Sequence, residues 1–127
     1  MNDEFTDEDV ARLLAWGRLL FGCFALLAPR RFERMWIGDA TEGTPSHMAT
    51  RGLGGRDLAI GIGILKSMEQ GGRVRGWLEA GAVADASDAL GTLGAWGELP
   101  KWKSALFLVL EVGAAYVGMH VAETIDA

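Results

Sequence analysis

The sequence has a single cysteine, a single tyrosine, three prolines and no excess of basic residues. An internal disulfide is excluded because Cys23 has no second cysteine to pair with. Threonine is also sparse, and no stretch alternates apolar and polar residues over several positions, so we expect almost no β-sheet. The net charge of -5 argues against nucleic acid as a partner, because a protein that binds phosphates needs a basic face.

The first nine residues carry several acidic side chains and lack the basic region that opens a secretory signal. We therefore expect the apolar segment after them to be retained in the mature protein. Half of the residues are hydrophobic and 18 are glycine. Long apolar stretches with many small side chains are typical of helices that pack closely in lipid. The length of 127 residues predicts one domain of the all-α class.

Glycine and proline divide the chain into four long segments. We expect helices over residues about 7–28, 46–68, 74–93 and 103–122, joined by short connections, which favours an up-and-down four-helix bundle that is transmembrane. Thr6 and Asp9 have the spacing of a capping box at the start of the first helix. Pro29 is expected to end that helix, because it lacks a backbone N–H group.

A lipid bilayer is the expected surrounding of these helices, in an integral protein of the cell membrane. The segments lack the broad charged face that a soluble bundle shows to water. Tryptophans fall at or near the segment ends, as in an interfacial aromatic belt: Trp36, Trp77, Trp96 and Trp102. Against this, Asp85 and Asp88 would each cost roughly 2.5 to 3.5 kcal/mol if isolated in lipid. A soluble helical bundle therefore stays an alternative.

Basic residues gather more on one side of the predicted bundle than on the other. One side has Arg30, Arg31, Arg34, Lys101 and Lys103. The other has Lys66, Arg73 and Arg75. The positive-inside rule then predicts that the first and third connections face the cytoplasm.

Each predicted helix carries a narrow face of small residues that includes charge. In the first helix this face is Ala11, Ala15, Arg18, Gly22 and Ala25. In the second it is Arg51, Gly55, Ala59 and Gly63, with Arg56 and Asp57 beside it. The third has Gly81, Asp85, Asp88 and Thr92, and the fourth has Ser104, Glu111, Ala115, Gly118 and Ala122. Small residues four apart let helix backbones approach closely, so we expect these faces to meet inside the bundle.

Seven charged side chains form the candidate interior binding site: Arg18, Arg51, Arg56, Asp57, Asp85, Asp88 and Glu111. Unpaired in lipid at roughly 3 kcal/mol each, they would cost on the order of 20 kcal/mol, so we expect them to pair or to line a wet cavity. Arginine suits this role because its planar fork holds carboxylates bidentately. With four acids and three arginines, one protonated carboxyl is expected. Glu111 is its expected place, because Leu and Val surround it and burial disfavours the charged form of an acid.

No cofactor and no metal are expected. His47, expected in a loop, and His120, expected near the interface, lack the neighbouring Cys or His of a zinc site. Residues 52–58 are no dinucleotide-binding turn, because Asp57 stands in place of the third glycine and no strand precedes it. Cys23 is expected to be a buried thiol rather than a nucleophile.

Several motifs occur in a recognisable order. They are Arg18 with Gly22 and Pro29-Arg30, Trp36-Ile-Gly38, Arg51-Gly-x-Gly-Gly-Arg56-Asp57-Leu-Ala-x-Gly61, Arg75-Gly-Trp77, and Ala84-Asp85-Ala-x-Asp88-Ala89. In this order the chain resembles a family of small four-span membrane proteins of bacteria, with relatives in fungi, known as a domain of unknown function. The resemblance covers most of the chain. It implies a membrane location and four helices, and it names no substrate.

Three functions fit these observations. In the first, the interior site binds or transports a small molecule, and the partners are that ligand and the lipid bilayer. In the second, the protein is a membrane enzyme, such as an isomerase or cyclase, that uses a carboxylic acid as proton donor. In the third, the ion pairs only fix the helix register, and the chain is a structural subunit that assembles through its glycine seams. A homodimer is a further expected assembly.

Overall fold

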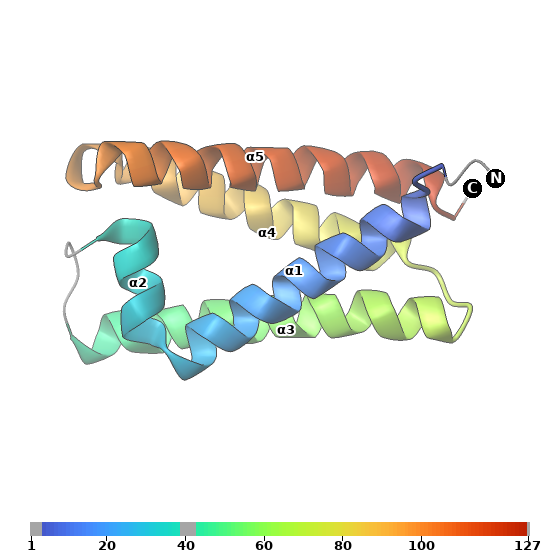
Figure 1. Ribbon diagram of the computed structural model, residues 1–127, viewed down its shortest axis with the longest axis horizontal. Coiled ribbons are helices and arrows are strands. Elements are labelled where there is room, and N and C mark those ends of the chain that lie inside the picture. The colour runs from blue at the N-terminus through green and yellow to red at the C-terminus, as the bar shows by residue number, and fades with distance from the viewer. Residues whose placement is uncertain (1–3, 39–42, 127) are drawn as a thin grey trace.

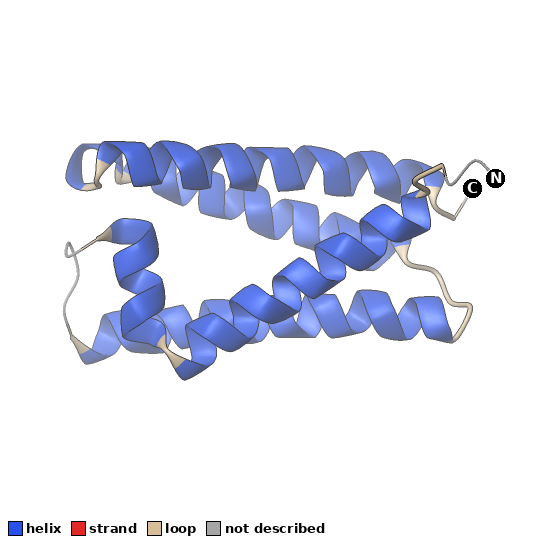
Figure 2. Ribbon diagram, viewed as in Figure 1, coloured by secondary structure: helices blue, strands red, loops and turns tan. Residues whose placement is uncertain are grey.

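Helices make up most of the part of the chain that the structure describes, residues 4–38 and 43–126 of a computed structural model (Figure 2). The elements are α1 (Asp7–Leu27), α2 (Pro29–Ile37), α3 (Thr44–Glu69), α4 (Arg75–Gly94), the 3₁₀ helix η1 (Trp96–Glu98) and α5 (Lys101–Thr124). No strand occurs over these ranges. The predicted all-α class is confirmed.

The four long helices α1, α3, α4 and α5 run in alternating directions (Figure 1). Helix α1 packs mainly on α3, and α4 packs mainly on α5, so the chain forms two closely packed pairs with lighter contacts between them. The capping box at the start of α1 is present, since Thr6 and Asp9 bond each other's backbone N–H groups. The Thr124 hydroxyl donates to Asp7 at 2.6 Å, which joins the end of α5 to the start of α1.

Helix α2 was not expected, because we assigned residues 29–45 to a connection. Pro29 does end α1, but it also occupies the first turn of α2. Proline is tolerated there because its missing N–H group has no partner in a helix and its fixed φ angle already suits one. In α2 the side chains of Phe32 and Glu33 point inward, and Arg30 and Arg34 are exposed. An aromatic series of edge contacts, Phe24 to Phe32 to Trp36, fastens α2 to α1.

Glycine lets α1 and α3 approach until their backbones nearly touch. A Cβ atom added at Gly54 would lie 2.7 Å from the Gly22 carbonyl oxygen, and one at Gly61 would lie 2.8 Å from the Ala15 carbonyl oxygen. The predicted face of α1 is confirmed, since its five residues are the buried residues of that helix. The predicted seam of α3 is only partly right. Gly54 and Gly61, and not Gly55, face α1, whereas Gly63 of the predicted seam lies against Trp77 of α4.

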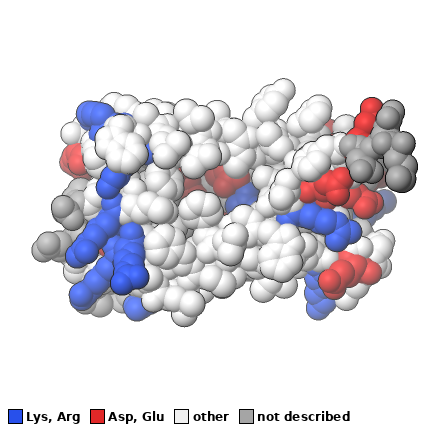
Figure 3. Space-filling model, viewed as in Figure 1, with Lys and Arg blue, Asp and Glu red and all other residues white. Residues whose placement is uncertain are grey.

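Large apolar side chains mostly point away from the interior of this molecule. Leu20, Leu90 and Val109, from three different helices, are 71%, 70% and 69% exposed. The interior is built largely from alanine, glycine and charged side chains. On the face shown in Figure 3, most Lys, Arg, Asp and Glu atoms gather at the two ends, and the broad band between them is uncharged except for a small patch of acidic and basic atoms near its centre. Cys23 is exposed rather than buried, which corrects the expectation for that thiol.

Two helices, α1 and α5, are long and apolar enough to cross a membrane, judged by length and composition. Helices α3 and α4 fall below that criterion. They are also the helices that carry four of the interior charges, Arg56, Asp57, Asp85 and Asp88.

Candidate functional site: a buried chain of ion pairs beside a cavity

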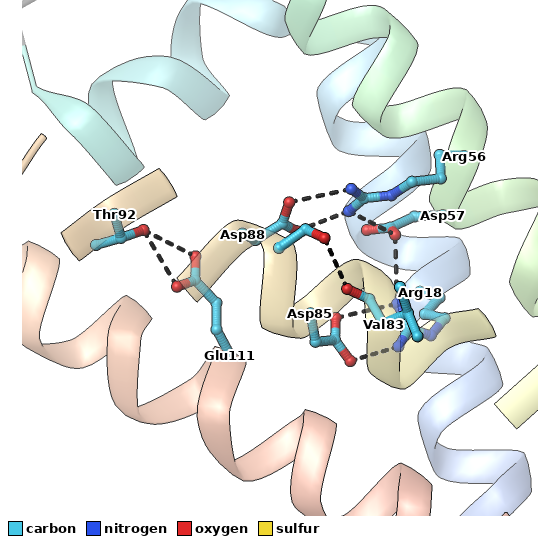
Figure 4. Close-up of polar contacts among 9 residues, drawn as sticks. Arg18, Arg56, Asp57, Val83, Asp85, Asp88, Thr92 and Glu111 are labelled. Atoms are coloured by element: carbon cyan, nitrogen blue, oxygen red, sulfur yellow. Dashed lines mark hydrogen bonds and ion pairs between the residues drawn. The ribbon is translucent and has the colours of Figure 1, made fainter. Parts of the chain in front are cut away.

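Arg18 connects three helices near the middle of the molecule (Figure 4). From α1, its Nη1 atom donates to Asp57 of α3 at 3.3 Å and to Asp85 of α4 at 3.2 Å. Its Nη2 atom donates to the second oxygen of Asp85 at 2.5 Å. Gly81 makes room for this guanidinium, because a Cβ atom there would lie 2.6 Å from Nη2. The Asp85 carboxylate is thus held bidentately, the strong geometry for an arginine.

Arg56 extends the same network along α3 and α4. Its two terminal nitrogens lie 3.0 and 2.7 Å from the carboxylate oxygens of Asp88. One of them also lies 3.4 Å from Asp57 Oδ1, the oxygen that Arg18 contacts. The ion pairs therefore run in one line from Asp85 through Arg18, Asp57 and Arg56 to Asp88. The predicted buried salt bridges are confirmed.

Glu111 of α5 is buried at 8% exposure but stands apart from both arginines (Figure 4). The Thr92 hydroxyl of α4 lies 3.2 and 3.1 Å from its two carboxylate oxygens. No basic side chain of residues 4–38 and 43–126 forms a salt bridge with it. Two arginines thus accompany four carboxylates in the interior, a formal charge of -2 if every group is ionised.

Six of the seven predicted site residues converge, and Arg51 does not. Arg51 is exposed, and its Nε atom donates to the Leu26 carbonyl oxygen at 3.4 Å. It precedes Arg56 by five residues, which at 3.6 residues per turn rotates it by roughly 140° around α3. Arg51 therefore ties α3 to the end of α1 and lies outside the interior network.

A cavity of about 260 Å³ lies beside the ion pairs and is lined by residues of all five α-helices. Its polar wall contains the six converging charged residues except Arg56. Its apolar wall includes Phe21, Phe32, Trp36 and Phe107. The Trp36 and Phe107 rings stack with their centroids 5.5 Å apart. The Trp36 indole nitrogen is buried and has no hydrogen-bond partner among the described residues.

Comparisons of this chain with protein-family models, with curated proteins and with solved structures found no match. The resemblance drawn from the sequence motifs therefore stays a prediction. The distances, charges and cavity of the site are therefore the evidence for its chemistry.

A second polar cluster, which the sequence analysis missed, lies where α2 meets the first turns of α3. Glu33 is buried there and accepts hydrogen bonds from Ser46 at 3.0 Å and from Thr50 at 2.6 Å. His47 Nδ1 lies 2.9 Å from the second Glu33 oxygen. His47 was expected in a loop, but it belongs to helix α3. The four-residue spacing of Ser46 and Thr50 places both hydroxyls on one face of a helix. That spacing does not identify their acceptor, because Glu33 lies on α2, which the sequence analysis did not predict.

This second cluster borders a cavity of about 410 Å³ that is lined from α2, α3, α4 and η1. Four residues line both cavities: Phe32, Trp36, Leu53 and Asp88. Two of these residues, Phe32 and Trp36, belong to α2, so this helix borders both cavities.

Glu33 gives a pH-dependent prediction. Burial raises its pKa, but hydrogen bonds from Thr50, His47 and Ser46 outweigh burial and hold the pKa below the ordinary value of 4.5. A carboxylate with a lowered pKa stabilises the folded state above pH 4.5, and that contribution is lost as the pH falls through the folded-state value. We expect Glu33→Gln to lower the free energy of unfolding by about 1 to 3 kcal/mol at pH 7, and by less at pH 3.

Denaturant titration in detergent micelles, followed by circular dichroism, measures this difference at both pH values. Glu98→Gln, at an exposed position of η1, is the matched control and should change little at either pH. An equal effect of Glu33→Gln at pH 7 and pH 3 would contradict the assignment.

Proposed function

We propose that the chain is an integral membrane protein whose α1, α3, α4 and α5 form a four-helix bundle across the bilayer. Helix α1 has 21 residues and is about 31 Å long, close to the thickness of roughly 30 Å of a hydrocarbon core. Leu, Val and Ile side chains on the outer faces of the four long helices suit lipid tails, and water would oppose such exposure. The largely uncharged band in Figure 3 supports the same placement.

The ion pairs lower the free-energy cost of placing the charged helices α3 and α4 in lipid. Asp85 and Asp88 would oppose insertion of α4 by itself, at roughly 2.5 to 3.5 kcal/mol each. Arg18 from α1 and Arg56 from α3 neutralise them at hydrogen-bonding distance. Intramembrane charges that pair and face the bundle interior are a default sign of a functional site.

Within this bundle, the interior site binds or transports a small molecule. The single observation that carries this proposal is the cavity of about 260 Å³ whose lining combines the ion pairs with aromatic rings. An apolar cavity with a few convergent polar groups is the usual form of a ligand site. Ion pairs that served only helix register would need no such space beside them.

Filling the cavity tests this function. Gly17 lines the cavity, and a Cβ atom added there meets no atom within 4 Å. In lipid nanodiscs, calorimetry with the neutral probe 4-phenylbutan-1-ol should show one saturable site, and Gly17→Phe should weaken it by at least about tenfold. Gly113→Phe, at an exposed position of α5 that is equally open, should leave binding unchanged. Probe uptake that is not saturable, or that Gly17→Phe leaves intact, would contradict a binding cavity.

Glu111 favours a second candidate, a membrane enzyme of the isomerase or cyclase kind. It lines the cavity, and its only hydrogen-bond partner among the described residues is Thr92, so a protonated Glu111 would face a bound substrate as a proton donor. Glu111→Gln and Asp88→Asn should then abolish turnover and leave the helical circular dichroism unchanged. Failure of both variants to accumulate would instead indicate a structural ion-pair core, the third function expected from the sequence.

A further inference from the structure

We propose that the ligand of this cavity is an organic cation: a protonated amine on an apolar, ring-sized body. The inference rests on the proposed binding function and names the chemical class of its ligand. Its evidence is the excess of carboxylates over arginines along the cavity wall and the aromatic rings that line the same cavity.

The charge balance comes first. The terminal nitrogens of Arg18 and Arg56 bond three aspartates, and neither arginine forms a salt bridge with Glu111. Glu111 lines the same cavity, is buried, and has only a hydroxyl as its hydrogen-bond partner in the described part of the chain. A buried carboxylate without a cation is costly and tends to take up a proton, as the sequence analysis expects for Glu111. A positive ligand would stabilise the ionised form of Glu111, whereas a negative ligand would be repelled by it. An ammonium has three donors, enough to reach Glu111 and still contact the nearby acidic wall.

The walls then define the rest of the ligand. Phe21, Phe32, Trp36 and Phe107 face the space beside Glu111, and aromatic faces attract alkylammonium groups and apolar bodies. No three His, Cys, Asp or Glu side chains of the described chain converge closely enough to hold a metal ion, which favours an organic cation over an inorganic one.

Three probes of one shape test the inference at pH 7 in nanodiscs: 4-phenylbutylammonium, 4-phenylbutan-1-ol and 4-phenylbutanoate. Calorimetry and the fluorescence of Trp36 in a variant lacking the other tryptophans report binding. The ammonium should bind at least about tenfold more tightly than the alcohol, and the carboxylate more weakly than either. This comparison uses the natural residues of the site, so it does not depend on any charge substitution being tolerated.

A charge variant then locates the effect. Glu111→Gln should cost the ammonium at least about tenfold in affinity and leave the alcohol within about twofold, because only the charged probe uses the carboxylate. Glu123→Gln, an exposed acid on the same helix, is the matched control and should change neither. Binding of the alcohol or carboxylate as tightly as the ammonium overturns the cation inference and leaves the binding function standing. Failure of all three probes to bind overturns both.

Discussion

Replacing Arg18 by methionine should lower the free energy of unfolding by about 3 to 5 kcal/mol, because it leaves the buried Asp85 without a cation and leaves Asp57 only its 3.4 Å contact with Arg56. Arg18 is the only side chain that bonds Asp85 among the described residues, and it also holds Asp57. Methionine keeps the length and apolar stem of the side chain, so the loss reports charge rather than volume. Denaturant titration in micelles, followed by circular dichroism, measures it.

Two further variants make this prediction specific. Arg12→Met, at an exposed position of the same helix, should change the free energy of unfolding by no more than about 0.5 kcal/mol. Arg18→Met combined with Asp85→Asn should recover part of the loss, since the double variant removes the carboxylate that Arg18→Met leaves without a cation. If Arg18→Met costs no more than Arg12→Met, the guanidinium is not what balances the interior acids.

Alanine at two neighbouring glycines of α3 should act with opposite signs. At Gly54 the new Cβ atom would lie 2.7 Å from the Gly22 carbonyl oxygen, so α1 and α3 must separate, at a cost of about 1 to 3 kcal/mol. At Gly52 the Cβ atom meets nothing within 4 Å, and alanine should stabilise by roughly 0.5 to 1 kcal/mol through its better helix propensity. The same denaturant titration compares the two variants.

This pair carries its own control, since both substitutions add one methyl group to the same helix. Equal effects at Gly52 and Gly54 would show that α1 and α3 do not approach through the Gly22 and Gly54 backbones. Gly22, Gly54 and Gly61 are covered by the contact between α1 and α3, so a homodimer would have to use other surfaces. The homodimer stays a prediction.

The sequence was most informative where small residues recur along one face of a long helix. The five predicted residues of α1 are the buried ones, and Arg18 is at the centre of the ion-pair line as its place in that stripe indicated. In α4 and α5, Asp85, Thr92 and Glu111 are buried as their spacing predicted. Helical periodicity fixes such a face without knowledge of the neighbouring helix.

Other features depended on contacts that spacing does not carry. In α3 glycines occur on several faces, so the seam was assigned one residue away from Gly54 and Arg51 was placed in the interior. Pro29 ends α1 and also begins α2, and the sequence analysis predicts only the first of these, so it does not find α2 or Glu33. The cavity is lined by residues of five helices, with rings from α1, α2 and α5 and charges from α1, α3, α4 and α5, so no single segment encodes it.

The central claim is that the apolar outer faces meet lipid and the charges meet each other inside. Single cysteines introduced on a Cys23→Ser background test it, at Leu20, Leu90 and Val109 on three outer faces and at Glu98 in η1 as the reference. In opened membranes a water-soluble maleimide should modify the Glu98→Cys variant and react at least about tenfold more slowly with the other three, because a thiolate does not form in hydrocarbon. Equal labelling at all four positions would place the outer faces in water and contradict the account.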